Sequence, residues 1–246
     1  MSNSQGLGGQ VAVITGASGS IGRAITLRLA AEGVVTCLLA RDPDRLQAVA
    51  QEAKAYGSRV EWYGVDLADA ASITALKDKL AKSVDRINIL VHCAGASALG
   101  SVEKASIEDL DWQYRVNVRG PYHLTQSLLP WILASRGQIV FINSLAGLLP
   151  PRQGTAQYAA TKYALRAIAD SLREEVNDKG VRVTSVYPGR TSSAMQAGVH
   201  AQEGRVYRPE LLMQPDDVAT VVMAALSLPR TAEMTDVSIR PMNKLS

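Results

Sequence analysis

The sequence is poor in the residues that define several large classes of protein. It contains two cysteines and three histidines in 246 residues. Cys37 and Cys93 both lie in apolar runs that resemble strands, so we interpret them as reduced thiols, with a disulfide as the alternative. No cluster of histidine, cysteine and carboxylate side chains has the spacing of metal ligands, and we therefore expect no metal site.

Long hydrophobic runs and blocks of one charge are also missing. No apolar run reaches the ~20 residues that a membrane-spanning helix requires. Basic and acidic residues are mixed and the formal net charge is +3, so nothing predicts a nucleic-acid surface. The N-terminal segment lacks the basic and apolar parts of a secretory signal. We therefore expect a cytoplasmic protein that binds neither nucleic acid nor a membrane.

What the sequence does contain is an alternation of short apolar runs and helical patterns. Apolar runs predict strands at 11–15, 34–40, 59–66, 87–95, 138–144, 181–189 and 235–241. Helical spacing, caps and terminal glycines predict helices at 21–33, 42–57, 69–83, 106–134, 155–178 and 215–228, with a bend at Gly120-Pro121. Because the strands are continuous apolar runs, both faces of the sheet are expected to be buried.

This alternation predicts an α/β fold in one domain over residues 1–246. The expected architecture is a Rossmann-type, doubly wound parallel sheet of about seven strands, with helices on both faces and ligands at the carboxyl ends of the strands. Residues 1–9 are expected to be flexible. Residues 190–214 are expected to be irregular and to form a substrate lid.

A glycine-rich turn, TGASGSIG at 15–22, connects the first strand to the first helix. Glycines allow a tight turn and a close approach of the backbone, and the helix presents free N–H groups to a phosphate. A plain loop between strand and helix is the alternative, but the placement favours dinucleotide binding. The residues expected to contact the cofactor here are Gly16, Ser18, Ser20, Ile21 and Gly22.

The end of the second predicted strand is expected to contact the adenosine ribose. An acidic residue there favours NAD, whereas an arginine favours the 2′-phosphate of NADP. The sequence has Ala40 followed by Arg41, whose planar fork of donors favours NADP, with NAD as the weaker candidate. The alternative is a surface pair between Arg41 and Asp42. Asp66, at the end of the third strand, is a candidate acceptor for the adenine amino group or else a cap for the next helix.

Several short motifs occur in one order along most of the chain. After TGASGSIG come VDL at 65–67, CAG at 93–95, VNVRG at 116–120, INS at 142–144, YAATK at 158–162 and YPGRT at 187–191. With these motifs the chain resembles the short-chain dehydrogenases/reductases. The resemblance implies an NAD(P) cofactor and a catalytic set of Asn117, Ser144, Tyr158 and Lys162. It also implies cofactor contacts from Asp66, Leu67, Ala94, Gly95, Tyr158, Lys162, Pro188, Gly189 and Thr191.

The tyrosine and lysine of YAATK can also be considered from physical chemistry. Tyr158 and Lys162 are four residues apart in a predicted helix, so their side chains share one face. A nearby ammonium group favours the phenolate, and lowering the pKa of a phenol by ~3 units requires about 4 kcal/mol. Lys162 and a positive nicotinamide ring could supply this in a water-poor site. We therefore expect the pKa of Tyr158 to be lowered. The spacing alone is a weak signal, because a chain with eight tyrosines and eight lysines can contain such a pair by chance.

Three further roles follow from the resemblance. Ser144 would hold the substrate oxygen and stabilise developing negative charge, although a serine after a strand is usually a turn residue. Asn117 would hold a water that passes protons to the catalytic lysine, with a local kink as the alternative explanation for an asparagine in mid-helix. Thr191 would hold the nicotinamide carboxamide.

The sequence departs from the family pattern at two places. The glycine turn usually reads T-G-x-x-x-G-x-G, but here Gly19 precedes Ser20. The segment often written N-N-A-G begins with His92 and Cys93. We expect His92 to replace an asparagine by hydrogen-bonding to the backbone. A redox role for Cys93 is the remote alternative.

These features predict an NADP-dependent oxidoreductase that interconverts a ketone or aldehyde and an alcohol. A cofactor-binding regulator without turnover is the alternative from another class, and a dehydratase or epimerase is a weaker third candidate. Arg190, Arg205 and Arg208 of the lid could bind an acidic substrate, although solvated surface charge is the default interpretation. The family resemblance also implies that the helices at 106–134 and 155–178 pair between subunits in a homodimer or homotetramer.

Overall fold

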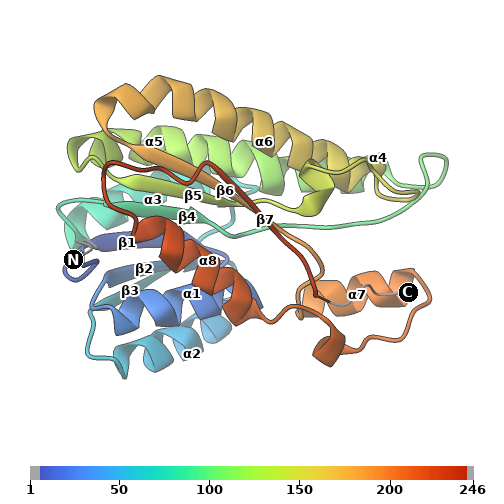
Figure 1. The fold of residues 1–246 in the computed structure, drawn as a ribbon, viewed down its shortest axis with the longest axis horizontal. Coiled ribbons are helices and arrows are strands. Elements are labelled where there is room, and N and C mark those ends of the chain that lie inside the picture. The colour runs from blue at the N-terminus through green and yellow to red at the C-terminus, as the bar shows by residue number, and fades with distance from the viewer. Residues whose placement is uncertain (1–5, 243–246) are drawn as a thin grey trace.

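The computed structural model describes residues 6–242, whose strands form one parallel sheet (Figure 1). The order across the sheet is β3-β2-β1-β4-β5-β6-β7. The predicted α/β fold with about seven strands is therefore confirmed. The strands are β1 (Val11–Thr15), β2 (Val35–Ala40), β3 (Val60–Gly64), β4 (Ile89–His92), β5 (Gln138–Ile142), β6 (Arg182–Pro188) and β7 (Asp236–Ile239).

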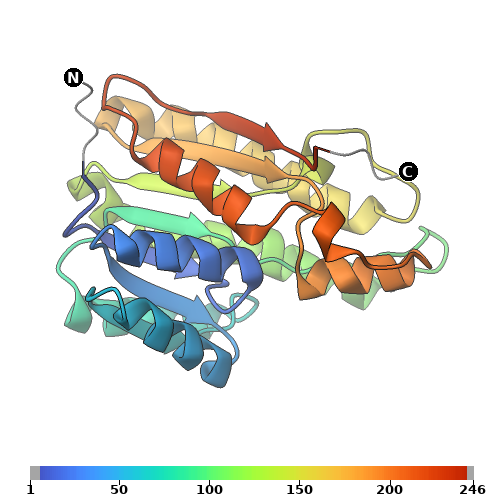
Figure 2. The ribbon, with the colours of Figure 1, turned by 60° about the horizontal axis from the view of Figure 1, so that its bottom comes forward.

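Helices cover both faces of this sheet, as predicted (Figures 1 and 2). One layer consists of α1 (Ser20–Ala31), α2 (Pro43–Lys54) and α8 (Pro215–Leu226). The opposite layer consists of α3 (Ala70–Ser83), α4 (Ile107–Tyr114), α5 (Gly120–Ala134) and α6 (Ala156–Val176). Contacts between α1 and α8 and between α3 and α5 hold each layer together.

The central strands are buried on both faces because their side chains alternate between two hydrophobic cores. Ala12 and Ile14 of β1 pack under the layer of α1, α2 and α8, whereas Val11 and Val13 pack under the other layer. The two edge strands differ from the prediction. In β3 only Val60 is buried, Trp62 is 37% exposed, and in β7 no residue is buried. An edge strand has a neighbour on one side only, so continuous burial is not required there.

Two predicted helix starts are confirmed by their caps. The Asp42 carboxylate accepts a hydrogen bond from the Arg45 N–H at 3.1 Å, and Pro43 is the first residue of α2. The Ser106 hydroxyl accepts from the Asp109 N–H at 3.0 Å at the start of α4.

The long helix predicted over 106–134 is interrupted one turn earlier than expected. A π-helical turn, Arg115–Arg119, separates α4 from α5, so the irregularity precedes Gly120-Pro121. Gly120 is required by packing rather than by a bend, because a Cβ atom there would lie 2.7 Å from the Leu67 carbonyl oxygen. The glycine permits close approach of the helix to the loop after β3. Turns of this kind frequently occur at functional sites.

The expectation for residues 190–214 is wrong in part. This segment contains α7 (Ala194–Gln202) and a 3₁₀ turn, Pro209–Leu211. The Ser193 hydroxyl caps α7 by accepting from the Gln196 N–H at 3.1 Å. Short length and an internal glycine, Gly198, weaken the helical signal of this segment in the sequence.

The expected flexible segment 1–9 lies partly outside the described residues. Of the part that is described, Leu7 is buried in the core and the Gly9 N–H donates to the Gly33 carbonyl at 3.0 Å. Leu7 is therefore packed against the body of the protein, whereas Gly8 and Gly9 are exposed, and the flexibility of residues 1–9 stays a prediction. Within residues 6–242 no helix is both long and apolar enough to cross a membrane.

Candidate active site

The order of the strands reverses between β1 and β4, which are neighbours in the sheet. From this point the chain builds the sheet outward to β3 on one side and to β7 on the other. Ligands of doubly wound sheets bind at the carboxyl ends of the strands beside such a reversal. The predicted site residues follow β1, β2, β3, β4, β5 and β6 or lie on α6 and the π-helical turn, so the fold directs them to this edge.

The turn after β1 requires glycine at two positions. Gly16 has φ of +65°, and a Cβ atom there would lie 2.8 Å from the Ala94 Cα. A Cβ atom on Gly22 would lie 2.2 Å from the Gly16 carbonyl oxygen. The departure at Gly19 and Ser20 leaves both contacts intact. Gly19 has φ of −83°, which other residues also adopt, and Ser20 is the first residue of α1. The helix therefore begins at the carboxyl edge of the sheet, where its first N–H groups suit a phosphate.

The loop after β4 is held beside this turn by one threonine hydroxyl. Thr15 Oγ1 accepts from the Cys93 N–H at 3.0 Å and from the Ala94 N–H at 3.1 Å. It donates to the Val91 carbonyl at 3.3 Å. These bonds fix Ala94 and Gly95 next to the glycine turn.

Asn117 connects the same loop to α6. It lies in the π-helical turn and is 1% exposed. Its Oδ1 accepts from the Ala96 N–H at 2.7 Å, while its Nδ2 donates to the Ala96 carbonyl at 2.8 Å and to Thr161 Oγ1 at 3.0 Å. The side chain thus positions the backbone beside Gly95. The water-holding role predicted for Asn117 stays a prediction.

Ser144, Tyr158 and Lys162 meet at the carboxyl end of β5. Lys162 Nζ lies 5.8 Å from the centre of the Tyr158 ring and donates to the Ile142 carbonyl at 3.4 Å. The Ser144 hydroxyl acts to lower the pKa of the Tyr158 phenol, and it accepts from the Ala146 N–H at 3.2 Å. The Asn143 amide anchors α6 by donating to the Lys162 carbonyl at 3.3 Å. A hydroxyl, a phenol and an amine therefore converge on one place.

Burial determines the direction of the pKa shift of Tyr158. It raises the pKa of the phenol, and the Ser144 hydroxyl only partly opposes this effect. Burial also lowers the pKa of Lys162 to about 8. In the protein without cofactor the pKa of Tyr158 is therefore raised, and Lys162 Nζ is directed toward a backbone carbonyl. The expected lowering by Lys162 together with a bound nicotinamide stays a prediction.

Cys93 lies near these groups, but its burial disfavours the reactive thiolate form. Burial raises the pKa of its thiol to about 12, although Lys162 acts in the opposite direction. The thiolate is the nucleophilic form, so the redox alternative for Cys93 is disfavoured. Cys37 and Cys93 are both free, and no three potential metal ligands gather anywhere in residues 6–242.

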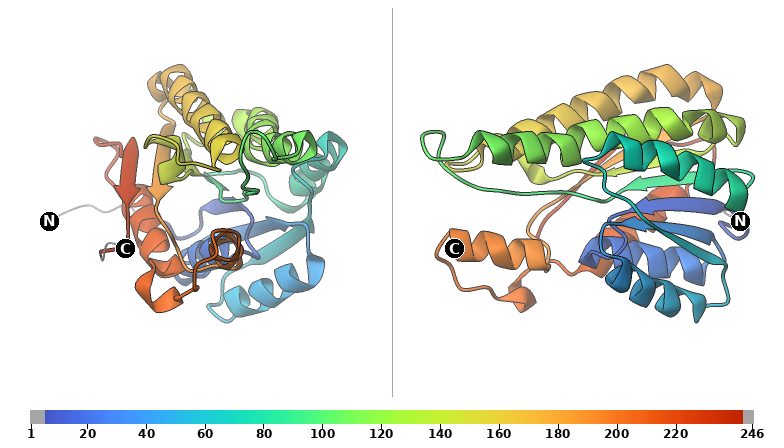
Figure 3. Two further views of the ribbon diagram at one scale, coloured as in Figure 1. Left: turned by 90° about the vertical axis from the view of Figure 1, so that its right-hand side faces the viewer. Right: turned by 180° about the vertical axis from the view of Figure 1, so that it is seen from behind.

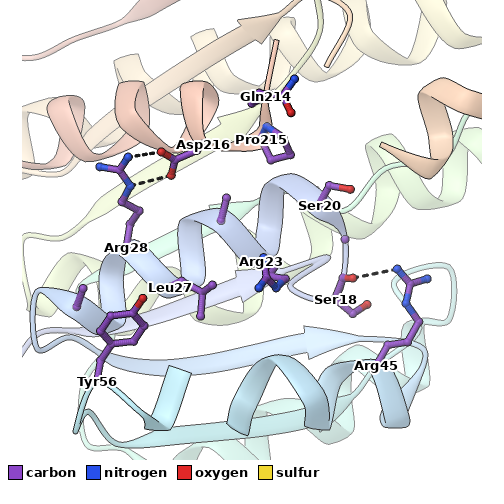
Figure 4. Close-up of a pocket in the computed structure, with 13 residues that line it drawn as sticks. Ser18, Ser20, Arg23, Leu27, Arg28, Arg45, Tyr56, Gln214, Pro215 and Asp216 are labelled. Carbon is purple, nitrogen blue, oxygen red and sulfur yellow. Dashed lines mark hydrogen bonds and ion pairs between the residues drawn. The ribbon is translucent and has the colours of Figure 1, made fainter. Parts of the chain in front are cut away.

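At the adenosine end, Arg41 follows β2 and is exposed. Asp42 uses its carboxylate to cap α2, and no ion pair joins it to Arg41 in the described part of the chain. The predicted alternative of a pair with Asp42 is therefore not found. Arg45, which sequence reasoning did not single out, donates to the Ser18 carbonyl at 3.2 Å (Figure 4). The sequence signal that could have pointed to Arg45 was its position three residues after Asp42, the capping residue of α2.

Asp66 follows β3 and is half-buried. Its Oδ1 accepts from the Ala68 N–H at 2.9 Å, and its own N–H donates to Ser72 Oγ at 3.1 Å. The N-cap of α3 is Asp69 instead. Asp66 therefore orders the turn before the helix, with one carboxylate oxygen bonded in this way. Leu67 beside it is 7% exposed.

A groove of about 550 Å³ runs along the outside of α1 between α2 and α8 (Figure 4). Ser18, Gly19 and Ser20 form one end of it, and Tyr56 lies near the other. Ion pairs of Arg23 with Glu52 and of Arg28 with Asp216 neutralise arginines in this region. None of the four predicted catalytic residues lines the groove, so it overlaps the predicted cofactor site only at the glycine turn.

The sixth strand ends at Pro188 and leads into the remaining predicted contacts. The Gly189 N–H donates to the Ile239 carbonyl at 2.8 Å, and Thr191 Oγ1 donates to the Gly189 carbonyl at 3.1 Å. Thr191 is also paired with Met213 in a short parallel bridge. Thr191 is 5% exposed and lies at the same edge as the predicted catalytic residues, but its contact with a nicotinamide stays a prediction.

Two of the three arginines proposed for an acidic substrate are already engaged. Arg190 donates to both carboxylate oxygens of Glu203 at 2.7 Å, and Arg205 lies 3.7 Å from the same carboxylate. Arg208 is exposed. The geometry therefore gives no support to an anion site made of these three residues.

His92 does not bond to the backbone as expected. Its Nε2 lies 2.8 Å from Thr125 Oγ1, its ring stacks on Phe141 at 4.7 Å, and its Nδ1 has no partner among the described residues. Burial lowers the pKa of His92 to about 3. The residue is a neutral core histidine that joins β4 to α5.

This burial predicts an acid-sensitive contribution to stability. As pH falls below 6.5, the unfolded chain binds a proton at His92, whereas the folded protein does so only near pH 3. The free energy of unfolding should fall by up to ~1.4 kcal/mol per pH unit in this window. His92→Gln, which keeps a donor for Thr125, should remove about 2 kcal/mol of the loss between about pH 7.5 and pH 5. Urea unfolding at fixed protein concentration measures this, and equal losses in the two proteins would refute the assignment.

Two residues that support the site were missed by sequence reasoning. Thr15 organises the loop after β4, and Thr161 receives the Asn117 amide. Both lie within motifs that were recognised, TGASGSIG and YAATK. The only signal was a hydroxyl at a strand end or on a buried helix face, where such groups often bond to the backbone.

Comparison with known proteins gives a consistent result. A family model described as short chain dehydrogenase matches residues 10–204. An uncharacterized oxidoreductase of Staphylococcus epidermidis is 32% identical over 237 residues, covering 95% of this chain and 97% of that protein. The oxidoreductase UcpA of Escherichia coli is 32% identical over 232 residues, covering 94% of this chain and 85% of that protein.

Solved structures agree with these relatives. A short chain dehydrogenase from Burkholderia cenocepacia, in complex with NADP, has a TM-score of 0.85 and 30% identity, covering 96% of this chain and 98% of that one. L-sorbose reductase from Gluconobacter frateurii, complexed with NADPH and L-sorbose, has a TM-score of 0.88 and 26% identity. The match covers 99% of this chain and 100% of that one. Sequence, fold and site geometry thus lead to one conclusion: this chain is an oxidoreductase of the short-chain dehydrogenase/reductase family.

Proposed function

We propose that this protein is an NADP-dependent oxidoreductase that interconverts a ketone or aldehyde and an alcohol. The observation that carries the proposal is the meeting of Ser144, Tyr158 and Lys162 at the carboxyl edge of the sheet. The glycine turn and the start of α1 lie at the same edge, beside Ala94. A hydride acceptor or donor and a proton donor would therefore be next to each other.

The residues fit a nicotinamide dinucleotide. Backbone N–H groups at the start of α1 suit the pyrophosphate, and Arg41 suits a 2′-phosphate. When bound, the nicotinamide supplies or accepts a hydride. We propose cofactor contacts from Gly16, Ser18, Ser20, Ile21, Gly22, Arg41, Asp66, Leu67, Ala94, Gly95, Tyr158, Lys162, Pro188, Gly189 and Thr191.

The proposed chemistry of the protein groups is a proton transfer at one oxygen. Tyr158 Oη donates its proton to the carbonyl oxygen of the substrate during reduction and removes it during oxidation. The Ser144 hydroxyl hydrogen-bonds to the same oxygen and stabilises its developing charge. Lys162, held by the Ile142 carbonyl, contributes positive charge beside the phenol. Asn117 connects the loop after β4 to α6 and so keeps both in place around these groups.

NADP rather than NAD is favoured by the end of β2. Ala40 offers no carboxylate to a ribose, and Arg41 is an exposed cation without an ion partner among residues 6–242. The complexes of the Burkholderia dehydrogenase with NADP and of L-sorbose reductase with NADPH are consistent with this preference.

We further propose a cytoplasmic homodimer or homotetramer with residues 190–214 as the substrate lid. Apolar side chains are exposed on the layer of α4, α5 and α6, including Ile107, Tyr114, Tyr122 and Tyr163. An exposed apolar surface of this kind is suited to contact with another subunit. Light scattering should give a mass of at least two subunits, and a monomer would contradict this proposal.

A screen of ketones and aldehydes tests the function. Loss of NADPH absorbance in the presence of a carbonyl compound is the expected result. Tight NADPH binding without turnover across the screen would instead indicate a cofactor-binding regulator. Product formed without net consumption of NADPH would indicate an epimerase or dehydratase.

A further inference from the structure

The two ends of the segment 190–214 are hydrogen-bonded to each other, and Met213 at the second end belongs to the hydrophobic core. The Met213 N–H donates to the Arg190 carbonyl at 3.2 Å, and the Ser192 N–H donates to the Met213 carbonyl at 2.8 Å. Leu212 and Met213 are each 7% exposed. Between these ends, α7 lies beyond the carboxyl ends of the strands and apart from both helical layers (Figures 1 and 3). The position of α7 must therefore depend on a few specific contacts.

One arginine makes the principal contacts with the far end of α7. Arg190 Nη2 lies 2.7 Å from both carboxylate oxygens of Glu203, which directly follows the helix. Arg190 Nη1 lies 3.4 Å from His200 Nε2. The side chains of Arg190 and Glu203 are 19% and 28% exposed. We call Arg190, His200 and Glu203 the Arg190 cluster.

The hydrogen bonds define how His200 takes part. Its Nδ1 lies 2.8 Å from the Gln196 carbonyl, so Nδ1 carries the proton and Nε2 accepts from Arg190. His200 is 5% exposed and is the only residue of α7 that is buried. Tyr207 packs edge-on against its ring at 5.4 Å. The Tyr207 hydroxyl also lies 3.1 Å from Ser192 Oγ and accepts from the Ser193 N–H.

We propose that Arg190 is a positioning residue that fixes α7 over the carboxyl edge of the sheet through Glu203. The inference rests on the proposed function, in which the segment covers the substrate. Arg190 directly precedes Thr191, so the ion pair connects the proposed nicotinamide contact to the far end of the lid helix. Loss of the pair should displace the part of the site that meets substrate and leave the glycine turn and Arg41 unchanged.

The chain offers a matched control for this pair. Arg205 also approaches Glu203, but at 3.7 Å and with a side chain that is 52% exposed. An exposed pair at this distance contributes little, whereas a partly buried, charge-assisted pair at 2.7 Å is stronger. The test variants are therefore Arg190→Gln and Glu203→Gln, with Arg205→Gln as the control and Arg190→Glu/Glu203→Arg as the reversed pair.

Hydrogen exchange of peptides covering 194–203 measures the position of α7 directly. In Arg190→Gln and Glu203→Gln, exchange should become about five- to tenfold faster, while peptides from β1 and α1 keep their rates. Arg205→Gln should exchange like the wild type, and the reversed pair should restore protection at least in part. Equal exchange in Glu203→Gln and wild type would overturn the proposal.

Steady-state kinetics separates positioning from a merely structural contact. With a carbonyl substrate from the screen, KM for that substrate should rise about five- to tenfold in both single variants, with KM for NADPH and kcat within about twofold of wild type. Faster exchange without a change in substrate KM would overturn the positioning role. If no compound is turned over, the proposed function fails, and hydrogen exchange still decides whether the pair holds α7.

Discussion

Replacing Tyr158 by phenylalanine is expected to lower kcat by about 10²- to 10⁴-fold, the range of a lost general acid. The substitution removes one oxygen atom and keeps the ring beside Lys162 and Ser144. NADPH binding, measured by the change in its fluorescence on titration, should stay within about threefold of wild type. A reacting proton is lost, whereas the glycine turn, Arg41 and the loop around Ala94 are untouched.

A neighbouring tyrosine provides the control for this experiment. Tyr163 follows Lys162 on α6, is 38% exposed, and donates its hydroxyl proton to the Leu149 carbonyl at 3.0 Å. Tyr163→Phe also removes one phenolic oxygen from α6 and should keep wild-type turnover. Retained activity in Tyr158→Phe would exclude Tyr158 as the acid and leave its position in the motif without a chemical role.

The raised pKa of Tyr158 favours one direction of the proposed reaction. A phenol donates a proton below its pKa and accepts one above it, and burial raises this pKa from 10.0. The phenol is therefore protonated at neutral pH, as carbonyl reduction requires. Lys162, with its pKa lowered to about 8, carries its charge below that pH and loses it above. Alcohol oxidation needs the phenolate and therefore depends on the additional positive charge of an oxidised nicotinamide.

Phenolate absorbance tests this electrostatic argument. The difference between wild type and Tyr158→Phe isolates the ionisation of one tyrosine. Without cofactor the midpoint of that ionisation should lie above pH 10, because burial raises the pKa of Tyr158 from its ordinary value of 10.0. With NADP⁺ bound it should occur at lower pH, because a positive charge favours the phenolate. An unchanged midpoint on NADP⁺ binding would remove the electrostatic basis of the mechanism.

Most of the fold followed from local sequence signals because hydrophobic periodicity and capping act over a few residues. The caps of α2 and α4 at Asp42 and Ser106 are examples. The turn at Gly16 was predictable for the same reason, since close approach of two backbones requires glycine. The doubly wound parallel sheet followed from the general behaviour of alternating α/β chains, whereas the order β3-β2-β1-β4-β5-β6-β7 was not predicted.

What could not be predicted depends on contacts between residues far apart in the sequence. His92 was assigned a backbone bond, yet its partners Thr125 and Phe141 lie on α5 and β5. The direction of the Tyr158 pKa shift depends on burial by the folded chain, which spacing to Lys162 does not reveal. The π-helical turn at Arg115–Arg119 and the short helix α7 are likewise fixed by tertiary contacts such as those of Asn117 and Arg190.

Replacing Arg41 by aspartate is expected to shift the ratio of kcat/KM for NADPH to that for NADH about 100-fold toward NADH. Two effects act in the same direction. A charge-assisted hydrogen bond to the 2′-phosphate, worth about 1.5–3 kcal/mol, is lost, and the new carboxylate repels that phosphate while accepting from a ribose hydroxyl. Asp42 does not offset the change, because its carboxylate caps α2 at the Arg45 N–H.

Two further variants separate the contact from the change in net charge. Arg41→Ala removes the cation without adding a carboxylate, so it should weaken NADPH use about tenfold and leave NADH use unchanged. Lys54→Glu alters the net charge by the same amount as Arg41→Asp. Lys54 is the last residue of α2, at the opposite end of that helix from Arg41. The ratio of kcat/KM for NADPH to that for NADH should therefore stay at the wild-type value in Lys54→Glu. An unchanged ratio in Arg41→Asp would mean that Arg41 does not bind the 2′-phosphate. Another cation near the glycine turn would then hold it, and Arg45 on α2, which donates to the Ser18 carbonyl, is the candidate.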